Sequence, residues 1–162
     1  MARRSRSPRP LRRVDTDFLD TAPVRLVFTL AITSPPQAVY RALAEDTEAW
    51  PAWFDSVKSA RRTAVGRDVA LAGGVRFEET VLVDEAPRRY VYRADTTSAP
   101  GLRALVEEWK VAPTGAGSLV QWTFAMDGPA PLRTVLRVLR PGLGRAFRGA
   151  VLKLDRRLAK AE

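Results

Sequence analysis

The feature that most constrains the fold is a series of short, alternating apolar segments between residues 57 and 126. Turn signals separate the segments: Gly66, Gly73-Gly74, Pro87, Pro100-Gly101 and the run 113–117. A glycine pair between two such segments is typical of a tight β-hairpin. Short strands joined by tight turns predict an antiparallel meander, here with strands over 57–65, 69–71, 75–83, 90–97, 105–111 and 119–126.

A further strand and two short helices are predicted before this series. Residues 24–32 carry apolar side chains at alternate positions, as a half-buried strand does. Ser34 and Gln37 have the spacing of a capping box, and the prolines beside them suit a first helical turn. We therefore expect a short helix after residue 34, and a second helical turn capped by residues 46–47.

After residue 131 the apolar spacing becomes that of a helix. The apolar positions are Leu132, Val135, Leu136, Leu139, Leu143, Phe147, Val151, Leu154 and Leu158. Arginine and lysine occupy the opposite face, which predicts a long amphipathic helix lying on the sheet. Pro141-Gly142 must kink or divide this helix, because proline removes a backbone hydrogen bond and clashes with the preceding turn.

Length and charge suggest how the chain is organised. A chain of 162 residues with a net charge of +9 fits one domain plus a tail. Residues 1–13 hold six arginines and no acid, and the remainder carries 21 basic against 18 acidic residues. We therefore expect a disordered Arg-rich tail over 1–20 and a domain over 21–162. No apolar segment is long enough to span a bilayer or to follow the arginines as a secretory signal would, so we expect a cytoplasmic protein.

The chain contains no cysteine and no histidine. This excludes disulfides, thiolate catalysis, imidazole-based triads and His-ligated metal centres. Acid–base chemistry at neutral pH would have to come from carboxylates, tyrosine, lysine or water. No carboxylate cluster has convincing metal-binding spacing, so we expect neither a metal nor another cofactor.

These elements predict an α+β architecture of the order β-α-α-β6-α. A seven-stranded curved antiparallel sheet carries the two short helices after its first strand, and the long C-terminal helix lies over its concave face. One helix is narrower than that face, so we expect an apolar pocket between the two.

Several local motifs accompany this order. They are 36–40 (PQAVY), 50–54 (WPAWF), Gly73-Gly74, 78–80 (EET), 87–93 (PRRYVYR) and 117–123 (GSLVQWT). Over residues 23–161 the chain resembles the START-like helix-grip superfamily (SRPBCC), in particular its polyketide cyclase/dehydrase-like branch. Such proteins include aromatase/cyclases, lipid carriers, quinone-binding proteins and hormone receptors, and they share no universal catalytic motif. The break at 140–144 departs from the unbroken helix common in similar proteins, which bears on how the pocket closes at that end.

Strand periodicity selects the candidate catalytic residues Glu79, Glu107 and Tyr92. Glu79 alternates with Phe77 and Glu107 with Trp109, which puts both carboxyls on the pocket side. A carboxyl on an apolar wall has a raised pKa and can act as an acid or a base. A single β-bulge changes which face of the sheet a residue lies on. We therefore favour the alternative that a bulge turns either carboxyl outward, or that an arginine at the pocket rim pairs with it. Tyr92 has the alternative of ordinary sheet packing.

The candidate ligand-binding residues are large and apolar, and their alternative role is ordinary core packing. They are Trp53, Phe77, Trp109, Trp122, Phe124, Leu136 and Phe147.

Three functions are compatible with these features. The first is binding of a small hydrophobic ligand: a lipid, a polyketide or an isoprenoid-like molecule. The second is a polyketide cyclase/dehydratase that uses pocket carboxylate or tyrosine acid–base chemistry. The third is a regulatory protein-, RNA- or membrane-binding module acting through the basic tail. Because the charge outside the tail is nearly balanced, we do not expect nucleic acid as the main partner. Weak membrane-surface contact through the basic tail or helix, and a monomer or a homodimer, are left open.

Overall fold

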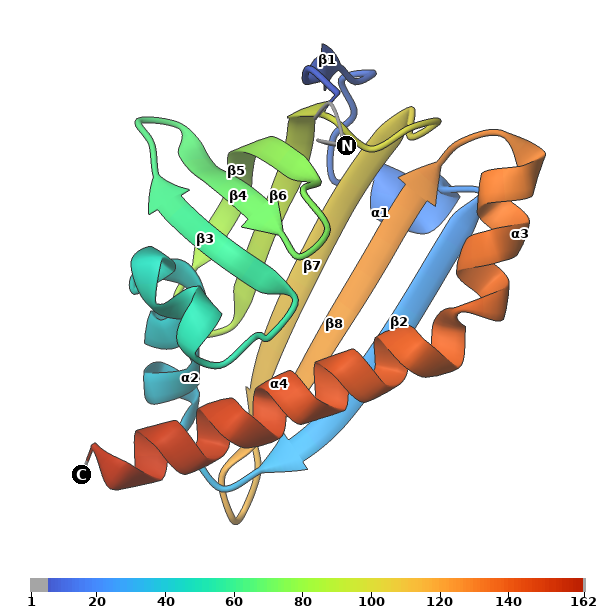
Figure 1. Cartoon of the computed structure of the whole chain (residues 1–162). Helices are drawn as coiled ribbons and strands as arrows, with labels where there is room; N and C mark the ends of the chain where they lie inside the picture. Colours follow the sequence, from blue (N-terminus) through green and yellow to red (C-terminus); the bar gives the residue numbers. More distant parts are fainter. Residues whose placement is uncertain (1–5, 162) are drawn as a thin grey trace.

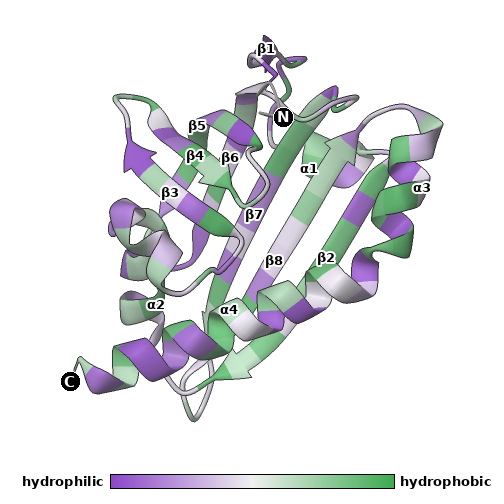
Figure 2. Cartoon of the chain, in the orientation of Figure 1, coloured by the Kyte–Doolittle hydropathy of each residue, from purple (hydrophilic) through white to green (hydrophobic). Residues whose placement is uncertain are grey.

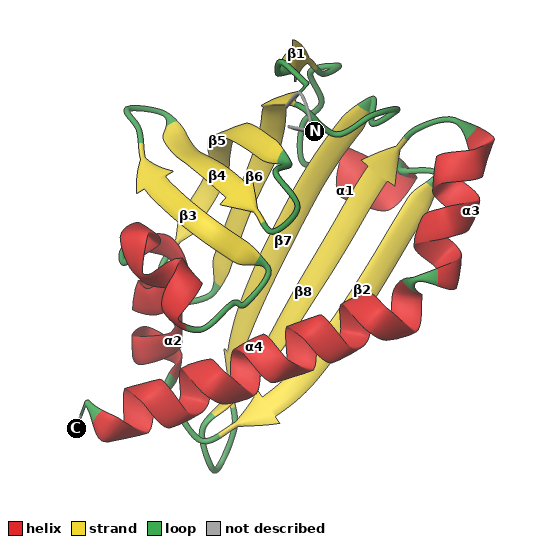
Figure 3. Ribbon diagram, viewed as in Figure 1, coloured by secondary structure: helices red, strands yellow, loops and turns green. Residues whose placement is uncertain are grey.

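The computed structural model describes residues 6–161, which form a curved antiparallel sheet with a long helix across its concave face (Figures 1 and 3). The seven long strands are β2 (Val24–Ile32), β3 (Val57–Arg62), β4 (Gly66–Leu71), β5 (Arg76–Glu85), β6 (Arg89–Thr97), β7 (Ala104–Pro113) and β8 (Ser118–Asp127). They are ordered β2-β8-β7-β6-β5-β4-β3 in the sheet, and every neighbouring pair is antiparallel. The predicted helix-grip fold, its meander and its seven strands are confirmed.

The hairpin between β4 and β5 turns at the predicted glycine pair. Gly73 and Gly74 have φ angles of +92° and +87°. Residues with a Cβ rarely adopt such angles, so the turn requires glycine at these positions.

Two short helices follow β2, as predicted: α2 (Pro36–Ala44) and the 3₁₀-helix η1 (Thr47–Ala52). Both predicted caps are wrong, because no side chain caps the start of α2 or of η1. The Ser34 hydroxyl donates instead to the Asp155 carboxylate at 2.5 Å, and the Ser34 backbone N–H donates to the same oxygen at 2.8 Å. Ser34 therefore ties the end of β2 to the C-terminal helix.

The C-terminal helix is divided, but not at the proline itself. One helix, α3 (Ala130–Val138), ends before Leu139, and a second, α4 (Arg140–Lys160), begins after it. Pro141 lies in the first turn of α4, where a missing N–H leaves no hydrogen bond unmade. Because the chain changes direction at this break, Val135 and Leu139 are 50% and 53% exposed instead of buried as predicted.

The N-terminal segment packs on the outer face of the sheet. Strand β1 (Arg9–Pro10) pairs with β6, and the short helix α1 (Phe18–Thr21) buries Phe18 and Leu19. The Arg9 guanidinium donates to the carbonyls of Leu102 and Ala99 at 2.8 and 2.6 Å. The structure thus differs from the predicted disordered tail for residues 9–20, because sheet pairing and an apolar patch hold them. The part of that prediction covering residues 1–5 lies outside the described residues.

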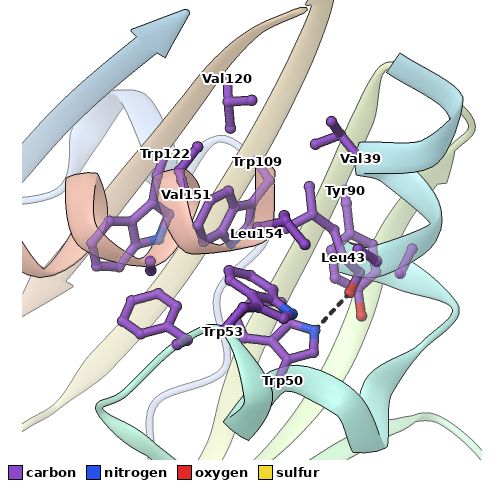
Figure 4. Packing of buried hydrophobic residues seen from close by; sticks show 14 of the residues in the cluster. Val39, Leu43, Trp50, Trp53, Tyr90, Trp109, Val120, Trp122, Val151 and Leu154 are labelled. Atoms are coloured by element: carbon purple, nitrogen blue, oxygen red, sulfur yellow. Dashed lines mark hydrogen bonds between the residues drawn. The ribbon is translucent and has the colours of Figure 1, made fainter. Parts of the chain in front are cut away.

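The main core lies between the sheet, α2, η1 and α4, and it is rich in tryptophan (Figure 4). Trp50 and Trp53 stack obliquely at 4.6 Å between ring centroids, and the Trp50 indole N–H donates to the Leu43 carbonyl at 3.1 Å. Along α4, apolar residues on the sheet side alternate with polar residues on the outer side (Figure 2). In the described part of the chain, no helix is both long and apolar enough to cross a membrane.

Candidate ligand-binding site

A cavity of about 160 Å³ lies between the concave face of the sheet, η1 and the first turns of α4. Its apolar lining consists of Trp50, Phe54, Val57, Val69, Leu71, Phe77, Leu105, Trp109, Trp122, Phe124, Leu143 and Ala146. Its polar lining consists of Ser56, Arg67, Glu79, Tyr92 and Glu107. The volume resembles that of an engineered apolar cavity of about 150 Å³ that holds benzene.

Strand register gathers four of the polar lining residues on neighbouring strands. Arg67 on β4 lies opposite Glu79 on β5, and Tyr92 on β6 lies opposite Glu107 on β7. Residues directly opposite each other in an antiparallel pair have adjacent side chains on the same face. Pairing of three successive hairpins therefore builds one polar cluster, defined here as Arg67, Glu79, Tyr92 and Glu107.

Arg67 is the buried cation of this polar cluster. Its Nε donates to Glu79 Oε2 at 3.0 Å, and the two side chains are only 4% and 5% exposed. The guanidinium carbon lies 4.2 Å from the ring centroids of both Trp50 and Tyr92, so aromatic faces hold it on two sides. Among the described residues, the terminal nitrogen Nη1 of Arg67 has no hydrogen-bond partner.

Glu107 is the second carboxyl of the polar cluster. Its Oε1 accepts from the Trp122 indole N–H at 3.1 Å. Burial, reinforced by the negative charge of Glu79, raises the pKa of Glu107 to about 7, although Arg67 opposes the shift. Burial also raises the pKa of Glu79, and the ion pair with Arg67 counteracts this. One cation and two carboxyls are electrically neutral when one carboxyl holds a proton, and Glu107 is the one without a direct ion pair.

Tyr92 is a neutral phenol in this setting. Its hydroxyl oxygen accepts from the Trp109 indole N–H at 3.1 Å. Burial and the nearby charge of Glu107 raise the pKa of Tyr92 well above its ordinary value. Tyr92 therefore acts as a hydrogen-bonding group rather than as a base near neutral pH.

Seven of the ten candidate residues predicted from the sequence line the cavity. They are Glu79, Glu107, Tyr92, Phe77, Trp109, Trp122 and Phe124. Their catalytic and ligand-binding roles remain predictions. A β-bulge does interrupt the pairing at Glu78/Glu79, and Glu79 does pair with an arginine, but that arginine is buried in the cavity wall.

Three candidate residues lie outside the lining. Trp53 is buried against Trp50 at 4.6 Å between ring centroids, and Phe147 is buried beside Trp109 at 6.0 Å. Leu136 belongs to α3, which turns away at the helix break and packs in a neighbouring apolar cluster. Hydrophobic spacing identified these residues as inward-facing, but it does not distinguish a cavity wall from the core behind it.

The sequence analysis missed Arg67, Trp50 and the α4 residues Leu143 and Ala146. Strand periodicity could have identified Arg67, because it alternates with Val69 and Leu71, which also line the cavity. The predicted strand began too late, at residue 69, to include it.

Comparison with known proteins places the chain in a family. The model of the polyketide cyclase/dehydrase and lipid transport family matches residues 23–159. The chain belongs to this family. An uncharacterized protein of Mycobacterium tuberculosis is 29% identical over 154 residues, covering 91% of this chain and 92% of its own length. An uncharacterized protein of Mycobacterium bovis matches to the same extent.

Two solved structures share the fold of this chain. A START superfamily protein from Mycobacterium smegmatis superposes with a TM-score of 0.66 at 12% identity, over 85% of this chain and 99% of its own. A protein from Thermus thermophilus gives a TM-score of 0.67 at 21% identity, over 86% of this chain and 99% of its own. The resemblance to the START-like helix-grip superfamily is thereby confirmed at the level of the fold.

Proposed function

We propose that this family member binds a small hydrophobic molecule in the cavity between the sheet and α4. The observation that carries the proposal is the uneven distribution of polar groups in the cavity lining. Aromatic and aliphatic side chains form most of the wall, and the charged groups lie together in the polar cluster. An apolar wall with a few convergent polar groups is the usual composition of a small-molecule site. A lipid, a polyketide or an isoprenoid-like compound fits this description.

The cavity volume limits how the ligand is held. About 160 Å³ accommodates a ring or a short chain, whereas sites for larger ligands typically measure about 300–1,000 Å³. A longer molecule requires movement of the wall, and Leu143 and Ala146 lie next to the helix break. We therefore expect a longer ligand to displace the first turns of α4.

Native mass spectrometry of freshly purified protein, followed by extraction, tests the binding function. We expect a co-purifying apolar compound or, in its absence, saturable binding of an uncharged fluorescent apolar probe. Failure of every such probe to bind would remove the proposal.

A second candidate function is acid–base catalysis, and the carboxyl of Glu107 in an apolar cavity favours it. With a pKa of about 7, Glu107 is present in both acid and carboxylate forms near neutral pH. In a cyclisation, its carboxylate would first take the α-proton from the carbon that attacks, leaving an enolate. As the enolate forms the C–C bond, the protonated Glu107 would give that proton to the carbonyl oxygen under attack, so the residue would end in its initial state. The cavity would hold the chain folded and exclude water.

Substitution of Glu107 tests this second function. If it is correct, Glu107→Gln abolishes turnover of a poly-β-keto substrate while ligand binding persists. Glu79→Gln is the companion variant, because it changes the ion-paired carboxyl instead. Unchanged turnover in both variants would leave a binding protein only.

Contact with an anionic membrane surface is a further proposal, and the exposed face of α3 favours it. Val135, Val138 and Leu139 are 50%, 72% and 53% exposed. Residues 128–154 carry six basic residues and no acid. Exposed apolar groups beside arginines suit an anionic lipid surface.

Sedimentation with anionic and zwitterionic vesicles tests this membrane contact. Val138→Ser should weaken binding to the anionic vesicles. Equal binding of the native protein to both vesicle types would contradict the proposal.

A further inference from the structure

We propose that the cavity takes an uncharged apolar molecule with an oxygen acceptor, which it places against Arg67 and Glu107. This inference rests on the proposed binding function and adds the chemical class of the ligand. Ketones, quinones, esters and amides on an apolar body belong to this class, and fatty-acid anions do not.

The first argument comes from the hydrogen bonds of Arg67. Its Nε is committed to Glu79, whereas its Nη1 is buried without a hydrogen-bond partner among the described residues. Buried N–H groups of native proteins are nearly always paired, so an unpaired one calls for an explanation. The rings of Trp50 and Tyr92 hold the guanidinium from two sides, which prevents it from turning toward another protein acceptor. Because Arg67 lines the cavity, a ligand oxygen is a suitable missing partner.

The second argument comes from the charges that line the cavity. The only charged side chains in its lining are Arg67, Glu79 and Glu107, as far as the described residues show. With Arg67 paired to Glu79 and a proton on Glu107, the cluster is neutral. A ligand carboxylate would add an uncompensated charge to an apolar enclosure, which is strongly unfavourable. A carbonyl oxygen adds no charge and can accept a hydrogen bond from either the Arg67 N–H or the Glu107 O–H.

Three small probes of similar size separate these contributions. Acetophenone offers an uncharged acceptor, ethylbenzene offers none, and benzoate offers an anionic one. Isothermal titration calorimetry at pH 6 measures all three on the full chain. We expect acetophenone to bind about tenfold or more tightly than ethylbenzene, because hydrogen bonds to charged groups are worth about this factor or more. We expect benzoate to bind at least about tenfold more weakly than acetophenone, because its charge must be buried.

A double variant tests whether Arg67 is responsible. Arg67→Met combined with Glu79→Leu removes both buried ions together and leaves neither unpaired, a change that proteins often tolerate. Ethylbenzene binding should persist in this variant, and the preference for acetophenone should fall severalfold, because only Glu107 remains as a donor. The matched control is Arg61→Met with Asp68→Leu, which removes an exposed ion pair between β3 and β4 and should leave the preference intact.

The outcomes distinguish this inference from the binding function on which it rests. If acetophenone and ethylbenzene bind the native protein equally, the acceptor contact is refuted and apolar binding stands. If benzoate binds as tightly as acetophenone, the restriction to uncharged ligands is refuted. If no probe binds, the binding function fails and this inference fails with it. The comparison on the native chain decides these points even if the double variant does not fold.

Discussion

Helices α3 and α4 continue one amphipathic sequence pattern, yet the protein holds them differently. In α4, Phe147, Ala150, Val151 and Leu154 are buried against the sheet. In α3, which lies wholly within the described residues, no side chain is buried. The same apolar spacing has therefore produced one anchored helix and one loosely packed helix.

The difference follows from the surface available to each helix. Helix α4 crosses the concave face, and the Asp155 carboxylate accepts hydrogen bonds from Thr33 and Ser34 at the end of β2. Helix α3 lies at the edge of the sheet beyond the break (Figure 1). Apolar periodicity thus predicts that a helix forms, but the sheet decides how much of it is covered. The cavity lies next to the helix break, where Leu143 and Ala146 of α4 line it.

The largest expected effect lies where α4 meets the cavity wall. Trp122 is 6% exposed and stacks on Phe147 of α4 at 6.1 Å between ring centroids. Trp122→Ala should lower the free energy of unfolding by about 3–5 kcal/mol if the site cannot collapse. Urea denaturation followed by circular dichroism measures this. A smaller loss accompanied by weaker ligand binding would show that Trp122 serves mainly as a pocket wall.

A pair of leucine truncations compares the two helices directly. Leu154 in α4 is 1% exposed, whereas Leu136 in α3 is only partly buried. Leu154→Ala should cost about 3 kcal/mol and Leu136→Ala about 1 kcal/mol, because a cavity forms only in the packed core. Equal losses in the same urea experiment would contradict the contrast between the helices.

Glu107 in the cavity wall should make the stability of the protein depend on pH. Because the folded pKa of Glu107 is about 7, above its ordinary value of 4.5, the folded state binds more protons between these values. The stability that this proton confers is complete below about pH 4.5 and is lost as pH rises through 7, a change of about 3 kcal/mol. Glu107→Gln should flatten this part of the stability profile. A profile unchanged by the substitution would show that Glu107 titrates normally.

The hydrogen bonds that Asp155 of α4 accepts from Ser34 and Thr33 should make a smaller contribution to stability, with the opposite dependence on pH. Burial opposes ionisation of Asp155, but hydrogen bonds from Ser34 and Thr33 prevail and lower its pKa below the ordinary 3.8. Its contribution is therefore present above that value and is lost as pH falls through the folded pKa. Asp155→Asn should cost about 1–2 kcal/mol at pH 7, and little at acid pH. The same loss at pH 7 and at a pH well below the folded pKa would show that the ionised form of Asp155 is not what stabilises this contact.

The smallest effect is expected on the exposed face of α3. Val138 is 72% exposed, so Val138→Ser should change the free energy of unfolding by less than about 0.5 kcal/mol. A loss well above this would reveal a packing partner for α3, such as a second copy of the chain. Measurement at two protein concentrations distinguishes a second copy from a contact within one chain.

Local sequence signals predicted the strands, the Gly73-Gly74 hairpin and the two short helices, because each depends on neighbouring residues alone. They did not predict the contacts made by distant residues. Ser34 has capping spacing but bonds to Asp155, which lies 121 positions later. The Arg67–Glu79 pair depends on the register between β4 and β5, which the residues next to Arg67 in the sequence do not determine.

The tryptophans give the cavity an optical property of its own. All four in the chain, Trp50, Trp53, Trp109 and Trp122, form one connected group, and neighbouring ring centroids are 4.6 to 6.4 Å apart. Indoles this close exchange excitation energy, so their fluorescence is a shared signal rather than four separate ones. Three of them line the cavity. A colourless ligand that quenches any one of them should dim the emission of the whole group, so the protein can report its own occupancy without a label.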